Sequence, residues 1–230
     1  MAKRVIYFLL ILSVAVFSIG CNKTNTESNN SSSEKLYSDE LLKYFPSVEG
    51  TVLNYCGVLE YEQTLTLNNV IDNDKEIKLN FKGEILDQSE GEGLPKKDRI
   101  LETEYIIGKN SVKEVQKNLN RRYSQSVIRE QVVLKLPIEK GNTWNQKVVV
   151  DGKEYTAQTK ITDVFKDDKN KSIVKTETVI KGIENYPENT YREIKIFKEG
   201  KGLVEFKNTI LLGEDKNPFE FGYMLFELNK

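Results

Sequence analysis

Residues 136–144 read LPIEKGNTW and residues 45–53 read FPSVEGTVL, so the chain contains one pattern twice. Each copy has an apolar residue before a proline, then a glycine four residues on, then Leu or Trp three residues later. Proline cannot donate to a strand ladder, glycine permits a positive φ, and a large apolar side chain opens the strand that follows. We therefore expect two equivalent turns that each lead into a strand. Their structural residues are Pro46, Gly50, Leu53, Pro137, Gly141 and Trp144.

The repeated pattern predicts two related β units, over about residues 44–120 and 130–230, inside a single antiparallel domain at 36–230. Composition agrees, because 11 Tyr and 10 Phe stand against only 2 Met, a balance that favours strands. The expected fold class is mainly β. One or more antiparallel sheets would form a sandwich or a curved half-barrel from two pseudo-repeated halves, with one or two short helices.

Local patterns locate several of these elements. Asp151-Gly152, between two strand-like runs, predicts a type I′ hairpin turn. Apolar residues alternate with polar ones over 77–81, and Gly83 is expected to end or bulge that strand. Residues 38–45 predict a short helix capped by serine. The Ser-x-x-Glu spacing at the start of 111–120 matches a capping box and predicts a second short helix.

The N-terminus has the features of a targeting segment. Residues 1–20 contain a basic pair and then the apolar run Val5–Phe17, which is short for a membrane span and typical of a signal peptide. Ser18–Cys21 resembles a bacterial lipobox, which implies a lipid on the Cys21 sulfur, seen as palmitate labelling, and cleavage before it. The alternative is an ordinary secretory signal. Residues 21–35, rich in Asn and Ser, predict a disordered tether that holds the domain on the extracytoplasmic face of the cell membrane.

Charge and residue counts exclude several function classes. The 34 basic and 35 acidic residues nearly cancel, so no nucleic-acid partner is expected. The chain has no histidine, which removes the Ser-His-Asp and Cys-His nucleophiles and the commonest transition-metal ligand. Apart from Cys21, Cys56 is the sole cysteine, and we expect it to be a small buried apolar side chain. We therefore expect no enzymatic activity, no metal site and no cofactor.

Several short motifs match known chemistry only in part. Ser172–Lys175 has the S-x-x-K spacing of penicillin-recognising enzymes but lies in a predicted strand without the partner motifs. Asp72–Glu76 begins like a calcium loop but lacks the later glycine and glutamate, so a turn is expected. The many carboxylates are expected on solvated faces. Five lysines are interpreted as hairpin-tip or sheet-edge residues: Lys169, Lys171, Lys195, Lys198 and Lys201.

One resemblance covers nearly all of the mature chain. The segments Tyr44–Pro46, Leu134–Pro137 with Gly141 and Trp144, and Gly200–Val204 resemble an uncharacterised group of clostridial-type lipoproteins with repeated Y-F-P-L-x-x-G-x-x-W modules. Leu53 departs from that pattern, because tryptophan is usual at its position. The resemblance implies an extracytoplasmic, membrane-anchored β protein and supplies no catalytic residue.

Two functional hypotheses remain. The first is a non-enzymatic envelope lipoprotein that acts as a binding or scaffold module for another envelope protein. The second is a half-barrel carrier whose curved sheet encloses a lipid or another hydrophobic ligand. The two differ in whether the sheet surrounds an open apolar cavity or a filled core.

Overall fold

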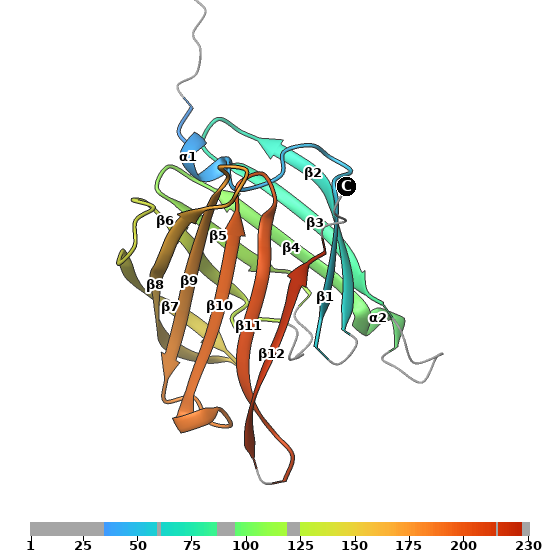
Figure 1. Cartoon of the computed structure of the whole chain (residues 1–230), viewed down its shortest axis with the longest axis vertical. Coiled ribbons are helices and arrows are strands. Elements are labelled where there is room, and N and C mark those ends of the chain that lie inside the picture. Colours follow the sequence, from blue (N-terminus) through green and yellow to red (C-terminus); the bar gives the residue numbers. More distant parts are fainter. Residues whose placement is uncertain (1–34, 59–60, 87–94, 119–124, 215, 227–230) are drawn as a thin grey trace, which may run out of the picture. The chain divides into compact units, whose positions relative to one another are not determined.

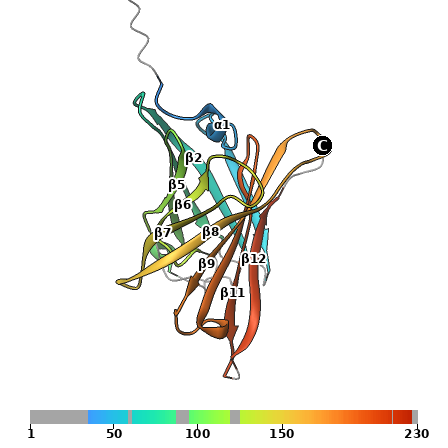
Figure 2. The same cartoon turned by 90° about the vertical axis from the view of Figure 1, so that its left-hand side faces the viewer.

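The computed structural model describes residues 35–58, 61–86, 95–118, 125–214 and 216–226. Within them, twelve strands form one antiparallel sheet in the order β6-β5-β4-β3-β2-β1-β12-β11-β10-β9-β8-β7 (Figure 1). The sheet is strongly curved and barrel-like, and its two end strands, β6 and β7, come close together (Figure 2). The predicted fold class is confirmed. The strands are β1 Val52–Gly57, β2 Glu62–Asp72, β3 Ile77–Ile85, β4 Ile100–Ile107, β5 Ser111–Gln116, β6 Glu130–Lys135, β7 Thr143–Val150, β8 Lys153–Lys166, β9 Ser172–Lys181, β10 Thr190–Lys198, β11 Gly202–Leu212 and β12 Asn217–Leu225.

The sheet consists of two consecutive six-stranded meanders, β1–β6 and β7–β12, within the described residues. Both begin in the same way. The N–H of Gly50 donates to the carbonyl of Leu67 (2.8 Å), and the N–H of Gly141 donates to the carbonyl of Ile161 (2.8 Å). Leu67 and Ile161 each donate back to the residue after the glycine, at 2.9 and 2.8 Å. The register between β2 and β3 then shifts directly after Leu67, and the register between β8 and β9 shifts directly after Ile161. The two halves therefore have the same type of turn, the same strand pairing and a bulge at the same place.

The residues of the repeated pattern occupy corresponding places, with one difference. Gly50 and Gly141 have φ of 82° and 97°. Leu53 and Trp144 are both buried and belong to the same hydrophobic core. The two turns differ at their prolines. The peptide bond between Leu136 and Pro137 is cis, whereas the bond before Pro46 is not.

Main-chain contacts also join the start of each repeated pattern, or the residue before it, to a hairpin of the other half. The N–H of Gly202, at the β10–β11 turn, donates to the carbonyl of Tyr44 (2.7 Å). The N–H of Leu136 donates to the carbonyl of Asn110, at the β4–β5 turn (2.9 Å). Main-chain hydrogen bonds at two hairpins therefore join the two halves.

The main core lies inside the curved sheet and is closed at one end by the N-terminal helix α1 (Asp39–Leu42). Ser38 caps this helix as predicted, its Oγ accepting from the N–H of Leu41 at 3.2 Å. The ring of Phe45 packs between the two halves, 4.8 Å from the ring of Tyr105 and 5.9 Å from that of Phe197. Other helical segments of the described residues are α2 (Lys96–Arg99) and a 3₁₀ turn at Pro187–Asn189. None of these helices has the length and apolar character needed to cross a lipid bilayer.

Other local predictions have mixed outcomes. The Asp151-Gly152 turn is confirmed, with φ of 53° and 77°, because both central residues of a type I′ turn need positive φ. The helix predicted over 111–120 is wrong: Ser111–Gln116 is strand β5, since pairing with β4 and β6 overrides the local capping signal. Gly83 was wrongly predicted to end or bulge its strand. It stays in register opposite Leu65, where the backbone of Thr64 leaves no room for a side chain.

Candidate functional site

Strand β10 places two charged side chains inside the sheet. They alternate along the strand with apolar side chains that face outward. Glu193 and Lys195 point inward, while Ile194 and Ile196 are only half-buried on the opposite face. The prediction that Lys195 lies at a hairpin tip or sheet edge is wrong. β10 is hydrogen-bonded to β9 and β11 along its length, so its inward side chains are enclosed.

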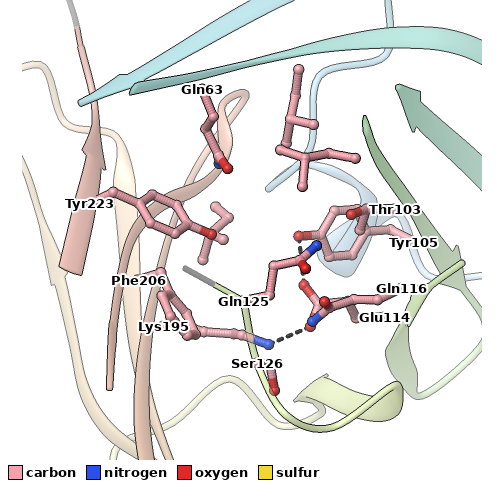
Figure 3. Close-up of a pocket in the computed structure, with 13 residues that line it drawn as sticks. Gln63, Thr103, Tyr105, Glu114, Gln116, Gln125, Ser126, Lys195, Phe206 and Tyr223 are labelled. Carbon is pink, nitrogen blue, oxygen red and sulfur yellow. Dashed lines mark hydrogen bonds and ion pairs between the residues drawn. The ribbon is translucent and has the colours of Figure 1, made fainter. Parts of the chain in front are cut away.

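A carboxylate from the other half meets this lysine. On β5, Glu114 and Gln116 point inward, and the ammonium of Lys195 forms an ion pair with Glu114 (Figure 3). Lys195 also forms an ion pair with Glu193 Oε1, at 3.2 Å. The side chains of Lys195, Glu114 and Glu193 are 4%, 5% and 1% exposed. The expectation that carboxylates lie on solvated faces is therefore wrong for these two glutamates. We call Glu114, Glu193 and Lys195 the charged triad.

Neutral donors complete the surroundings of the charged triad. Tyr105 donates to Glu114 Oε1 (2.9 Å), and Tyr191 donates to Glu193 Oε2 (2.7 Å). The Gln131 amide donates to Glu193 Oε1 (2.7 Å). Because buried charges are tolerated only when they are paired and hydrogen-bonded, these partners account for the presence of the triad inside the sheet.

The electrostatics hold Lys195 and Glu193 in their charged forms. Burial acts to lower the pKa of Lys195, but the charges of Glu114 and Glu193 outweigh it, so the pKa is raised. Burial acts to raise the pKa of Glu193, but the Lys195 charge and the hydrogen bonds outweigh it, so this pKa is lowered. Burial and the nearby carboxylates raise the pKa of Tyr105 and Tyr191, so both stay neutral donors. A nucleophilic lysine needs a lowered pKa, and this arrangement does the opposite.

A small cavity lies against one side of the charged triad, with a volume of about 40 Å³. Its polar lining comes from both halves of the sheet and from the segment before β6 (Figure 3). Binding sites for drug-sized molecules measure roughly 300–1,000 Å³, whereas a few tens of Å³ hold water-sized guests. The cavity therefore has no room for an acyl chain. Its polar lining residues include Gln63, Thr103, Glu114, Gln116, Gln125 and Lys195.

Side chains close the gap between the end strands β6 and β7, which share no strand ladder. The Gln146 Oε1 accepts from the N–H of Val132 (2.7 Å), and its Nε2 donates to the Val132 carbonyl (3.0 Å). The Trp144 Nε1 donates to the same carbonyl (3.2 Å). One amide side chain thus makes the two bonds that a neighbouring peptide group would make. We call this contact the β6–β7 seam.

The remaining residues singled out from the sequence lie apart from the charged triad. Residues 1–34, with the signal peptide, Cys21 and most of the tether, lie outside the described residues. Cys56 is only half-buried, on the outer face of β1, so the prediction of a buried side chain is wrong. Ser172–Lys175 lies in β9, and Asp72–Glu76 connects β2 to β3 as the predicted turn.

The charged triad was missed because each member had a simpler local explanation. Glu114 fitted a capping box, and Lys195 lay near other lysines. One signal was available. On β5, Glu114 shares a strand face with Val112, and on β10, Glu193 and Lys195 share one with Phe197, so these charged residues alternate in step with an apolar residue of the inward face.

Comparisons with known proteins are limited to distant structural likeness. No protein-family model matches the chain, and no curated protein matches it. Among solved structures, a candidate lipoprotein from Parabacteroides distasonis has 8% identity and a TM-score of 0.42, over 79% of this chain and 96% of that one. A candidate exported protein with a YmcC-like fold from Bacteroides fragilis has 9% identity and a TM-score of 0.45, over 83% and 97%. No functional conclusion is drawn from likeness at this level.

Proposed function

We propose that this protein is a lipid-anchored module of the cell envelope. It is attached through Cys21 to the extracytoplasmic face of the membrane, and it binds a protein partner on its outer surface without catalysis. The small size of the cavity beside Glu114 supports the binding part of this proposal. The cavity of about 40 Å³ is far smaller than a lipid carrier needs, and Lys195 is held protonated by its carboxylates. The outer surface is then the part of the domain available for recognition.

An apolar strip on the outer face of β1 and β12 supports this proposal. Met224 lies opposite Cys56, and Phe226 donates its N–H to the carbonyl of Asn54 (2.8 Å), so these positions are neighbours. Val52 lies on the same outward face of β1. The side chains of Val52, Met224 and Phe226 are each more than half exposed. Exposed apolar residues that lie near one another on one face are typical of protein-binding surfaces. We call Val52, Cys56, Met224 and Phe226 the outer strip.

The proposal is tested with the full chain in a bacterium that processes lipoproteins. Wild-type protein should incorporate palmitate and fractionate with the membrane, and Cys21→Ser should abolish both. Cys56→Ser is the matched control and should change neither, because Cys56 lies within the folded domain. Palmitate labelling that persists in Cys21→Ser would contradict the anchor.

Partner binding is measured in the same cells by crosslinking and mass spectrometry. Met224→Asp places a charge in the outer strip and should remove the proteins captured by the wild type. Phe165→Asp, at another exposed apolar residue, should retain them. Equal capture by both variants would contradict the proposed surface. Stoichiometric lipid extracted with the purified protein would instead favour the carrier hypothesis.

A further inference from the structure

The charged triad carries an unbalanced charge. Two carboxylates, Glu114 and Glu193, face one ammonium, Lys195, and all three side chains are at least 95% buried. The charges that act on Lys195 are those two glutamates, and the charge that acts on Glu193 is Lys195. Among the described residues, two carboxylates and one ammonium therefore meet in a region shielded from solvent, and their formal charges sum to −1. An uncompensated buried charge is strongly unfavourable, which favours binding of a counter-charge.

The cavity beside Glu114 presents oxygen acceptors that have no hydrogen-bond partner among the described residues. The Oε1 atoms of Gln116 and Gln125 are buried and accept no hydrogen bond from the described residues. Their side chains are 6% and 9% exposed, and both line the cavity together with Glu114 and Lys195 (Figure 3). Buried amide oxygens are normally satisfied, so two of them at one cavity indicate a guest. Such a guest must interact with oxygen acceptors.

The size and ligand set narrow the chemistry of this guest. Water would satisfy the amide oxygens but would leave the net charge unbalanced. A divalent cation such as Ca²⁺ prefers roughly six to eight oxygen ligands with several carboxylates. The described residues contain no group of three or more acidic, cysteine or histidine side chains arranged to hold a metal. A monovalent cation requires only one compensating carboxylate and suits neutral oxygen ligands.

We propose that this cavity binds a small monovalent cation, of the size of Na⁺, K⁺ or ammonium. The carboxylate of Glu114 supplies the charge, and the amide oxygens of Gln116 and Gln125 supply neutral ligands. Lys195 pairs with Glu193 and holds the Glu114 carboxylate beside the cavity. The three proposed ligands, Glu114, Gln116 and Gln125, come from β5 and from the segment before β6, so a bound cation stabilises the folded arrangement of these two parts of the chain. This inference does not depend on the identity of the surface partner.

The first test is thermal unfolding of the purified full chain in NaCl, KCl or NH₄Cl at constant ionic strength, with tetramethylammonium chloride as the balancing salt. Tetramethylammonium is too large for the cavity. The unfolding midpoint should rise with the small cation and saturate, by about 5–10 °C at a concentration about 100 times the dissociation constant. Equal midpoints in all four salts would overturn the proposal.

Variants and a direct readout complete the test. Glu114→Gln keeps the shape and removes the unbalanced charge, so the dependence on the cation should disappear. Glu130→Gln, at an exposed carboxylate of the neighbouring strand, should keep it. Crystals grown in RbCl should show an anomalous peak among Glu114, Gln116 and Gln125. Absence of this peak would overturn the proposal, whatever the stability of the Glu114→Gln protein.

Discussion

The β6–β7 seam predicts that one amide side chain has a large effect on stability. Gln146→Leu removes both hydrogen bonds to the main chain of Val132, at 2.7 and 3.0 Å, while keeping a side chain of similar volume. The Val132 carbonyl retains the Trp144 Nε1 as a donor (3.2 Å), whereas its N–H loses the Gln146 partner. The substitution therefore isolates the closure of the seam from the packing of the core.

The expected loss follows from the two main-chain groups. A buried main-chain group left without a partner costs about 1–3 kcal/mol. Val132 is only partly buried, and its carbonyl keeps one donor, so we take the lower half of that range. The free energy of unfolding should fall by about 1–2 kcal/mol. The Val132 amide should exchange about 5–30 times faster, since each 1.4 kcal/mol is about a factor of ten.

The assay is urea denaturation followed by circular dichroism and by the emission of the sole tryptophan. Trp144 is 5% exposed, so the wild type should emit at short wavelength, and Gln146→Leu should shift this emission to the red. Gln158→Leu is the matched control. Gln158 lies on the paired strand β8, is exposed, and makes only a 3.4 Å contact with Asn145, so its loss should be within about 0.5 kcal/mol. Equal stability of the two variants, with unchanged exchange at Val132, would refute the role of Gln146 in closing the sheet.

Two further predictions concern the backbone of β3 and the behaviour in acid. Gly83→Ala should cost at least about 3 kcal/mol in urea denaturation, because its Cβ would lie 1.7 Å from the Thr64 carbonyl oxygen. The control is Gly108→Ala, whose added Cβ would lie 3.8 Å from its nearest neighbour, so the free energy of unfolding should fall by less than about 1 kcal/mol. Similar losses in the Gly83 and Gly108 variants would show that β2 and β3 separate easily. The pKa of Asp167 in the folded protein is lowered by the N–H of Lys171, the Lys198 ammonium and the N–H of Lys169. The Asp167 carboxylate therefore stabilises the fold fully above its unfolded pKa of about 4. This stabilisation is lost as the pH falls through the lower folded pKa. Asp167→Asn should therefore flatten the fall in the urea midpoint between about pH 5 and pH 2, and an unchanged slope would be evidence against this carboxylate.

Several features of the fold were predictable because they depend on residues close together in the chain. The positive φ at Asp151 and Gly152 follows from the type of turn that joins two adjacent strands. The cap at Ser38 is a contact across three residues. The inward face of β3 follows from simple alternation of apolar and polar residues. The repeated proline-glycine pattern indicated the correspondence of the two halves, which the matched bonds of Gly50 and Gly141 show in space.

The candidate site required the tertiary structure. Alternation identifies residues that share a strand face, but on β10 both faces contain apolar side chains, so the pattern alone does not tell which face is inside. The capping-box signal at Ser111 was overridden by pairing on both sides of β5. The Lys195–Glu114 pair joins residues 81 positions apart, through a sheet whose curvature no local segment specifies.

The sequence by itself therefore determined the class of fold, several local turns and the matching turns at Gly50 and Gly141, because these depend on backbone preferences and on short-range periodicity. The closure of the sheet through Gln146, the burial of Lys195 and the cavity beside Glu114 were decided only by the tertiary structure. Their physical cause is the enclosure that a curved sheet creates. It brings distant side chains together in a region shielded from water, where a charge must find a partner.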